Sequence, residues 1–105
     1  MTELKHHIYL FEAVRPELTT DEDAWTADDL QIASEHFSYL KEATSKRIVI
    51  LAGRSTDGLG PAIVIIDIAD EDEARSFMEN DPFVASGLMR GHLHPFRASL
   101  IRQTS

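Results

Sequence analysis

Hydrophobic positions along the chain alternate between strand-like runs and helical spacing. The segment His6–Val14 is rich in β-forming residues and ends at Arg15-Pro16, which predicts a first strand. Two later runs, Arg47–Gly53 and Pro61–Ile68, are rich in β-branched residues. The short glycine-containing loop between them favours an antiparallel hairpin.

Apolar residues between the first two strands recur at spacings of three and four, which is the period of an α-helix. Thr26 is a suitable N-cap, and the acidic residues after it favour the positive end of the helix dipole. The pattern predicts a helix from Thr26 to Lys46. We expect its core-facing stripe to consist of Leu30, Ala33, Phe37 and Leu40.

A second helix is predicted after Asp70, which is a suitable N-cap. Its expected inner face consists of Ala74, Phe77 and Met78. Because a proline disfavours helical geometry at the residue before it, Pro82 predicts that the helix ends near Asn80. Asp81 can then cap a short helical turn that has Pro82 in its first position.

The last strand is predicted over Leu88–Ile101 and contains Pro95. Proline cannot donate to a strand ladder, so this strand lies at an edge of the sheet or is interrupted there. The order of elements is βαββαβ, which is typical of a ferredoxin-like α+β sandwich with both helices on one face of the sheet. A chain of 105 residues has room for one such domain, residues 1–105.

The two middle strands are apolar on both faces, as Ile48–Leu51 and Ile63–Ile66 show. The helices cover one face, and so short a chain cannot cover the other. A homodimer that packs sheet on sheet would cover it. The alternative is that the third strand is simply central and leaves some apolar area exposed.

Composition excludes several classes of function. The chain has 18 acidic and 10 basic residues and a net charge of −8, which repels phosphate backbones, so we expect no nucleic-acid partner. It has no cysteine, which excludes disulfides, thiolate nucleophiles and cysteine zinc sites. No apolar run is long enough to span a membrane, and the polar N-terminus does not resemble a signal peptide. We therefore expect a cytoplasmic protein without a membrane partner.

Histidines are frequent in so short a chain, with five in all. His6-His7 and the pair His92 and His94 have spacings that suit metal ligands. The antiparallel pairing expected for the first and last strands would put the two pairs at opposite ends of the sheet. We therefore expect packing or solvated roles for these four histidines, and no metal site.

His36 differs from the other histidines because it lies on a predicted helix, about 80° from the centre of the apolar stripe. A half-shielded imidazole there can still reach a ligand and exchange a proton. By itself, such a residue is more often a boundary residue than a catalyst. Asp81 is the second candidate, since a carboxylate fixed by a turn can orient an imidazole, although capping alone would account for it.

Three stretches of the sequence resemble the YciI-like (YCII-related) family of small ferredoxin-like proteins. They are "SEHFSYLKEATSKRIVILAG", "AIVIIDIADEDEARSFMENDPFVASGL" and "HPFR", and together they extend the resemblance over nearly the whole chain. The most telling residues are His36 with Tyr39, Ala52-Gly53, Asp81-Pro82-Phe83 and Gly87-Leu88. The resemblance implies a dimeric α+β barrel and a site centred on a histidine and an aspartate, here His36 and Asp81.

The resemblance also bears on chemistry, because the family includes an enzyme that eliminates chloride from a chlorinated hydroxyquinol. This chain departs from the family pattern in two places. Gly53-Arg54 replaces the usual Gly-Pro, and His94 replaces the arginine that many relatives have before the final Pro-Phe. The changed loop at Arg54 affects the identity of a substrate more than it affects the fold.

Two main hypotheses for function follow, with a lesser third. The first is an acid-base enzyme that acts by elimination or isomerisation on a small organic substrate. His36 would move the proton, Asp81 would fix the tautomer of His36, and Tyr39, Arg54 or Arg15 would bind an anionic oxygen. No sequence fingerprint indicates a cofactor.

The second hypothesis is a non-catalytic dimeric protein with a small-molecule-binding or regulatory role, in which His36 and Asp81 are structural. A lesser third option is a metal-binding protein that uses the clustered histidines.

Overall fold

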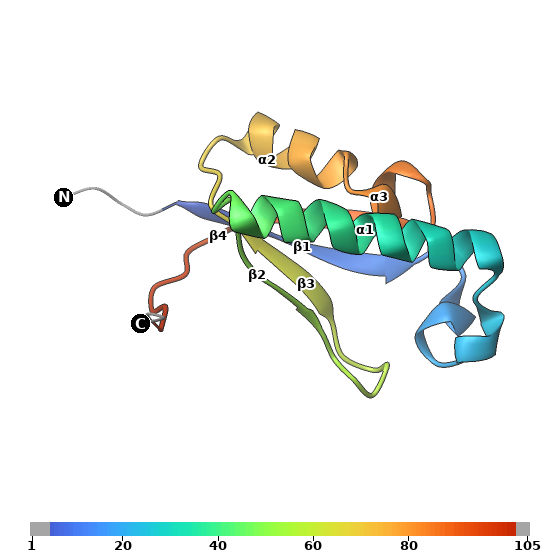
Figure 1. Ribbon diagram of the computed structural model, residues 1–105. Coiled ribbons are helices and arrows are strands. Elements are labelled where there is room, and N and C mark those ends of the chain that lie inside the picture. The colour runs from blue at the N-terminus through green and yellow to red at the C-terminus, as the bar shows by residue number, and fades with distance from the viewer. Residues whose placement is uncertain (1–4, 103–105) are drawn as a thin grey trace.

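The computed structural model describes residues 5–102, and Figure 1 shows their arrangement. None of the helices in this part of the chain is long and apolar enough to cross a membrane. The elements are β1 (His6–Ala13), the short 3-10 helices η1 (Pro16–Thr19) and η2 (Glu22–Ala24), α1 (Ala27–Ser45), β2 (Val49–Arg54), β3 (Ala62–Ile66), α2 (Glu71–Glu79), α3 (Pro82–Ala85) and β4 (Met89–Phe96).

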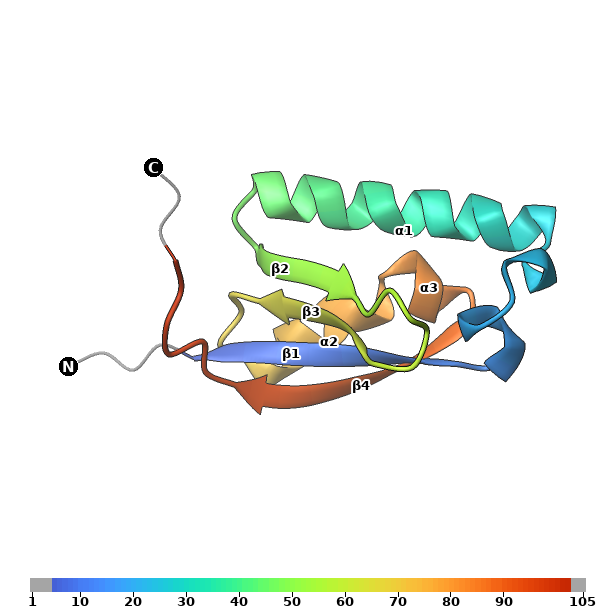
Figure 2. The same cartoon turned by 90° about the horizontal axis from the view of Figure 1, so that it is seen from below.

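The four strands form one sheet in the order β2-β3-β1-β4, and every neighbouring pair is antiparallel. Figures 1 and 2 show α1 and α2 on the same side of this sheet, while no helix of the described chain covers the other side. The ferredoxin-like fold predicted from the order of elements is therefore confirmed. β4 is an edge strand, as Pro95 indicated.

The helix starts follow from local side-chain caps. Thr26 and Asp29 form a capping box at the start of α1, with each side chain accepting the other's backbone N–H. Asp70 caps α2 by accepting from the N–H of Glu73. Asp81 caps α3, and Pro82 is the first residue of that helix. All three caps were predicted from the sequence.

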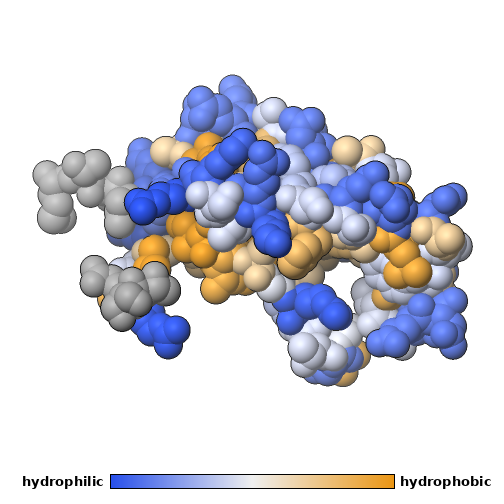
Figure 3. All heavy atoms as spheres, viewed as in Figure 1, coloured by the Kyte–Doolittle hydropathy of each residue, from blue (hydrophilic) through white to orange (hydrophobic). Residues whose placement is uncertain are grey.

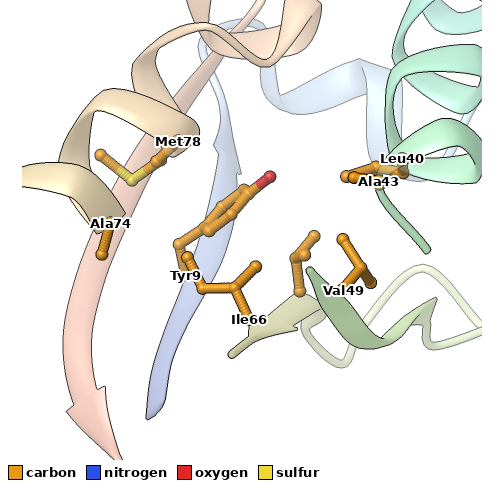
Figure 4. Close-up of a cluster of buried hydrophobic side chains, with 8 residues drawn as sticks. Tyr9, Leu40, Ala43, Val49, Ile66, Ala74 and Met78 are labelled. Carbon is orange, nitrogen blue, oxygen red and sulfur yellow. The ribbon is translucent and has the colours of Figure 1, made fainter. Parts of the chain in front are cut away.

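The hydrophobic core lies between the sheet and the two long helices. Figure 4 shows Tyr9 rising from β1 in the middle of this cluster, with its hydroxyl pointing away from the sheet and into the space between α2 and α1. The predicted inner face of α2 is correct, since Ala74 and Met78 are buried and Phe77 packs against the core. The buried members of the core are Tyr9, Leu40, Ala43, Val49, Val64, Ile66, Ala74 and Met78.

The predicted stripe of α1 is correct for Leu40, which is buried in the core, but wrong for Leu30 and Phe37. Leu30 and Phe37 are 58% and 67% exposed, so they do not face the core of the chain. The helix is instead turned so that Asp29, Leu40 and Ala43 are buried. His36 shares this inner face, because it follows Asp29 by two helical turns. The apolar spacing did not predict this orientation, because the inner face of the helix carries two polar residues with specific partners, Asp29 and His36.

The predicted positions of the clustered histidines are also wrong. β4 ends at Phe96 rather than Ile101, shortly after Pro95, which has no N–H to donate. In the β1–β4 register, His6 lies opposite Phe96 and His94 opposite Ile8. His6 and His94 are thus diagonal neighbours at the same end of the sheet.

Three of the four histidines outside the helices, His6, His7 and His92, have an identifiable polar contact. Ala98 N–H donates to His6 Nδ1 at 3.1 Å, and His7 Nδ1 donates to the carbonyl of Ile68 at 2.7 Å. His92 lies 3.1 Å from Glu12 on the sheet surface. Within residues 5–102, no group of three or more histidine or acidic side chains is arranged to hold a metal ion.

The loop of the β2–β3 hairpin rests against η1, and this contact requires glycine. Gly58 has a positive φ of 77°, and a Cβ built on it would lie 2.2 Å from the carbonyl oxygen of Thr19. Gly87 has a similar φ of 80°, but a Cβ there would meet nothing within 4 Å. A side chain at Gly87 would therefore meet only the cost of a left-handed backbone. A side chain at Gly58 would meet that cost and also the clash with Thr19.

We expect Gly87→Ala to lower the free energy of unfolding by about 1 kcal/mol, the usual cost of a left-handed alanine. Gly58→Ala should lower it by about 2 kcal/mol or more, because the hairpin must also move away from Thr19. Urea denaturation of both variants measures the difference. Equal losses would show that the contact between the hairpin and η1 does not constrain the fold.

Candidate active site

Asp81 is placed by the turn between α2 and α3. Its backbone is extended, which ends α2, and its side chain caps α3 by accepting from the N–H of Phe83 at 3.0 Å. Asp81 is 0% exposed. The Asp81-Pro82 turn between α2 and α3 therefore places a carboxylate in the interior of the protein.

The fold brings His36 to this carboxylate across 45 positions of sequence, with His36 Nδ1 lying 2.6 Å from Asp81 Oδ1. An ionised carboxylate only accepts hydrogen bonds, so the proton of a neutral His36 ring belongs on Nδ1. The other ring nitrogen, Nε2, then carries the free lone pair. The side chain of His36 keeps 16% of its surface exposed, which leaves it in contact with solvent.

Tyr9 is a member of the same cluster that the sequence analysis missed. From the middle of β1, its hydroxyl donates to Asp81 Oδ2 at 2.8 Å, and the whole residue is 0% exposed. Burial, together with the charge of Asp81, raises the pKa of Tyr9. A tyrosine on the core face of a strand needs a partner for its hydroxyl, and this requirement was the available signal.

Aromatic rings surround the imidazole of His36. The ring of Phe83 stacks on it with centroids 3.8 Å apart and planes 17° from parallel, and Phe11 meets it edge-on at 5.4 Å. Trp25, just before α1, packs against Phe83 at 6.3 Å. These rings exclude water from one side of the pair, which strengthens the electrostatic interaction between His36 and Asp81.

Tyr39 lies on α1 close to the pair, but its hydroxyl is already engaged. It donates to the backbone carbonyl of Phe77 at 2.8 Å and so joins α1 to α2. Burial, with a contribution from the charge of Asp81, raises the pKa of Tyr39 to about 12. The predicted role of Tyr39 in binding a substrate would require this hydroxyl to change partners.

The structure does not bring the two predicted anion-binding arginines into contact with His36 or Asp81. Arg15 forms an ion pair with Asp29. The N–H of Thr26, followed by Arg15, holds the pKa of Asp29 below its usual range. Arg54 ends β2 and is exposed, and it has no ion pair or hydrogen bond from its side chain within residues 5–102.

Two surface hollows lie away from the His36–Asp81 pair. One, of about 610 Å³, is at the start of β1, where it is lined by His6, His7 and Phe96 among others. The other, of about 130 Å³, lies between α1 and α2 beside Tyr39 and Phe77. The pair is therefore open to solvent through the exposed part of His36 rather than through either hollow.

The fold is similar to that of a known enzyme. The match is to 5-chloro-2-hydroxyhydroquinone dehydrochlorinase from Burkholderia phenoliruptrix AC1100, solved in complex with 2,5-dihydroxybenzoquinone, with a TM-score of 0.61 and 20% sequence identity. It covers 87% of this chain and 93% of that chain. Similarity at this identity shows the fold alone.

Sequence comparison gives a family rather than a single relative. No curated protein sequence matches the chain. The profile of the YCII-related domain matches residues 16–94, which is most of the chain and includes both His36 and Asp81. The resemblance stated from the sequence is thereby confirmed, and the chain belongs to the YCII-related domain family.

Proposed function

We propose that this protein is an acid-base enzyme in which His36 moves a proton on a small organic substrate. The observation that carries the proposal is the contact of 2.6 Å between His36 Nδ1 and the buried carboxylate of Asp81. This contact occupies one ring nitrogen and leaves Nε2 as the base. Asp81 fixes the tautomer of the ring and supports its positive charge after protonation.

The proposed reaction is an elimination or an isomerisation. In an elimination, Nε2 of His36 takes a proton from a carbon or hydroxyl of the substrate. The released electron pair forms a new double bond, and the leaving group departs from the neighbouring atom with its bonding pair. In an isomerisation, the imidazolium returns the proton to a different carbon of the substrate.

The similar structure supports this class of reaction, because a dehydrochlorinase removes a proton and chloride from its substrate. The aromatic surroundings of His36 suit a flat, apolar substrate. Arg54, which has no ion pair among the described residues, would attract an anionic oxygen that a chain of net charge −8 otherwise repels, and Arg15 would do so on leaving Asp29. The substrate proposed here is a small organic ring or anion.

We also propose that the protein is a homodimer that packs sheet on sheet. On the side of the sheet that no described helix covers, Ile8 pairs with Ile65 and Leu10 with Ile63. Leu51 and Phe96 extend this apolar area and are 50% and 37% exposed. Figure 3 shows hydrophobic residues gathered below α1, where the sheet emerges. A second copy is the partner whose surface matches an apolar sheet face of this kind.

Two observations favour a second candidate, a non-catalytic dimeric protein that binds a small molecule or has a regulatory role. Asp81 caps α3 through Phe83 as well as contacting His36, and neither surface hollow includes the pair. In that case the pair would serve only to join α1 to the turn before α3.

A screen of small organic substrates with the purified protein and its His36→Ala and Asp81→Asn variants tests the enzyme. We expect both substitutions to lower kcat by about 10²-fold to 10⁴-fold, the usual contribution of a positioned acid-base group. Arg75→Ala is the matched control, because that side chain is exposed on α2, pairs with Glu71, and belongs neither to the site nor to the open face of the sheet. Circular dichroism verifies folding.

Retention of full activity by either folded site variant would contradict the acid-base role. An equal loss in Arg75→Ala would also contradict it, because the loss would then not depend on the site.

Sedimentation tests the dimer. We expect a dimer at micromolar concentration and a monomer for Ile65→Asp, because the carboxylate would be buried unpaired between the two sheets. Leu59→Asp is the control, since Leu59 is 82% exposed on the hairpin loop and should leave the dimer intact. A monomeric wild-type protein would refute the proposal.

A further inference from the structure

The hydroxyl of Tyr9 has no part in the function proposed above, although it touches the same carboxylate. Tyr9 is 0% exposed and lies between Val64 of β3 and Leu93 of β4 in the sheet. It therefore cannot contact a substrate in the described structure. Any effect that it has on the chemistry must pass through Asp81.

We propose that Tyr9 is a positioning residue: its hydroxyl holds the second oxygen of Asp81, so that the carboxylate stays ionised and turned toward His36. An effect of Tyr9 on catalysis rests on the proposed function, whereas its hydrogen bond to Asp81 does not. The arrangement itself is a relay of Tyr9, Asp81 and His36 that joins β1 to α1 through the turn before α3.

The hydrogen bonds of Asp81 divide unequally between its two oxygens. Oδ1 has two donors, the ring of His36 and the N–H of Phe83. Oδ2 has a single donor among the described residues, the hydroxyl of Tyr9. Because Asp81 is 0% exposed, water does not replace a lost donor, and removal of the hydroxyl leaves Oδ2 buried and unpaired.

Among residues 5–102, few other charges face this relay. Tyr39 of α1 is one further titratable group, and the charge of Asp81 opposes its ionisation. Phe77 of α2 and Phe83 of α3 are uncharged. The ion pair of Arg15 with Asp29 lies on the inner face of α1 two turns before His36. Tyr39→Phe is therefore a matched control, because its hydroxyl donates to Phe77 and not to Asp81.

The test is an NMR titration of the His36 ring in the wild type, Tyr9→Phe and Tyr39→Phe. Without the hydroxyl of Tyr9, the carboxylate beside a neutral ring is less stable, so the pair takes up a proton more readily. We expect the midpoint of proton uptake by the pair to move to higher pH by about one unit, a tenfold change in proton affinity. Tyr39→Phe should leave the midpoint unchanged.

A double-variant cycle shows whether Tyr9 acts through Asp81. In the Asp81→Asn background, Tyr9→Phe should no longer move the titration of His36. An unchanged midpoint in Tyr9→Phe alone, or an equal shift in Tyr39→Phe, would overturn the positioning role. So would a shift that persists in the Asp81→Asn background.

A second measurement covers the case in which Tyr9→Phe does not fold. The signal of the Tyr9 hydroxyl proton is then followed by NMR in the wild type and Asp81→Asn, where replacing the carboxylate with a neutral amide should weaken this hydrogen bond and move the signal upfield. An unchanged hydroxyl signal would refute the relay. These outcomes are separable from the proposed function, because a shifted midpoint without any turnover would refute the enzyme and leave the relay in place.

Discussion

The structure depends on one fully buried acidic side chain, the carboxylate of Asp81. A carboxylate that is removed from water must be compensated by hydrogen bonds or by an opposite charge, and loss of one partner is strongly destabilising. Here the donors come from β1, α1 and α3, through Tyr9, His36 and Phe83. These three segments are far apart in sequence, so the need to satisfy a single side chain fixes the position of α1 relative to the sheet and the turn.

Aromatic residues surround the hydrogen bonds of Asp81 and His36. Ring contacts run from Trp25 through Phe83 and Phe11 to Tyr9, and onward through Phe77 to Tyr39. The imidazole of His36 lies within this series, stacked on Phe83. Such a shell lowers the local dielectric constant, which strengthens a satisfied hydrogen bond and penalises an unsatisfied one. Asp81 and its aromatic neighbours therefore stabilise the site together. Phe83 contributes in two ways, because its backbone N–H donates to Asp81 and its ring stacks on His36.

Local signals in the sequence predicted the caps and the order of elements, because each depends on a few neighbouring residues. Thr26, Asp70 and Asp81 all cap helices as predicted. The orientation of α1 could not be predicted in this way, since Leu30 and Phe37 are more apolar than Asp29 and His36, which face inward. That choice depends on partners supplied by distant segments. The contact of Tyr9 with Asp81 depends on the same long-range packing, and the family resemblance rather than spacing singled out His36 with Asp81.

The two faces of β1 connect the candidate site to the uncovered side of the sheet. Tyr9 and Phe11 point to the helices and the site, whereas Ile8 and Leu10 alternate with them and point to the open face. A slip of one residue in the register of β1 would exchange these two sets completely. Apolar packing of a second copy against Ile8 and Leu10, as proposed for the dimer, would therefore oppose the same slip that removes Tyr9 from Asp81. The proposed association at the open face and the order at the site would thus be two consequences of one strand register.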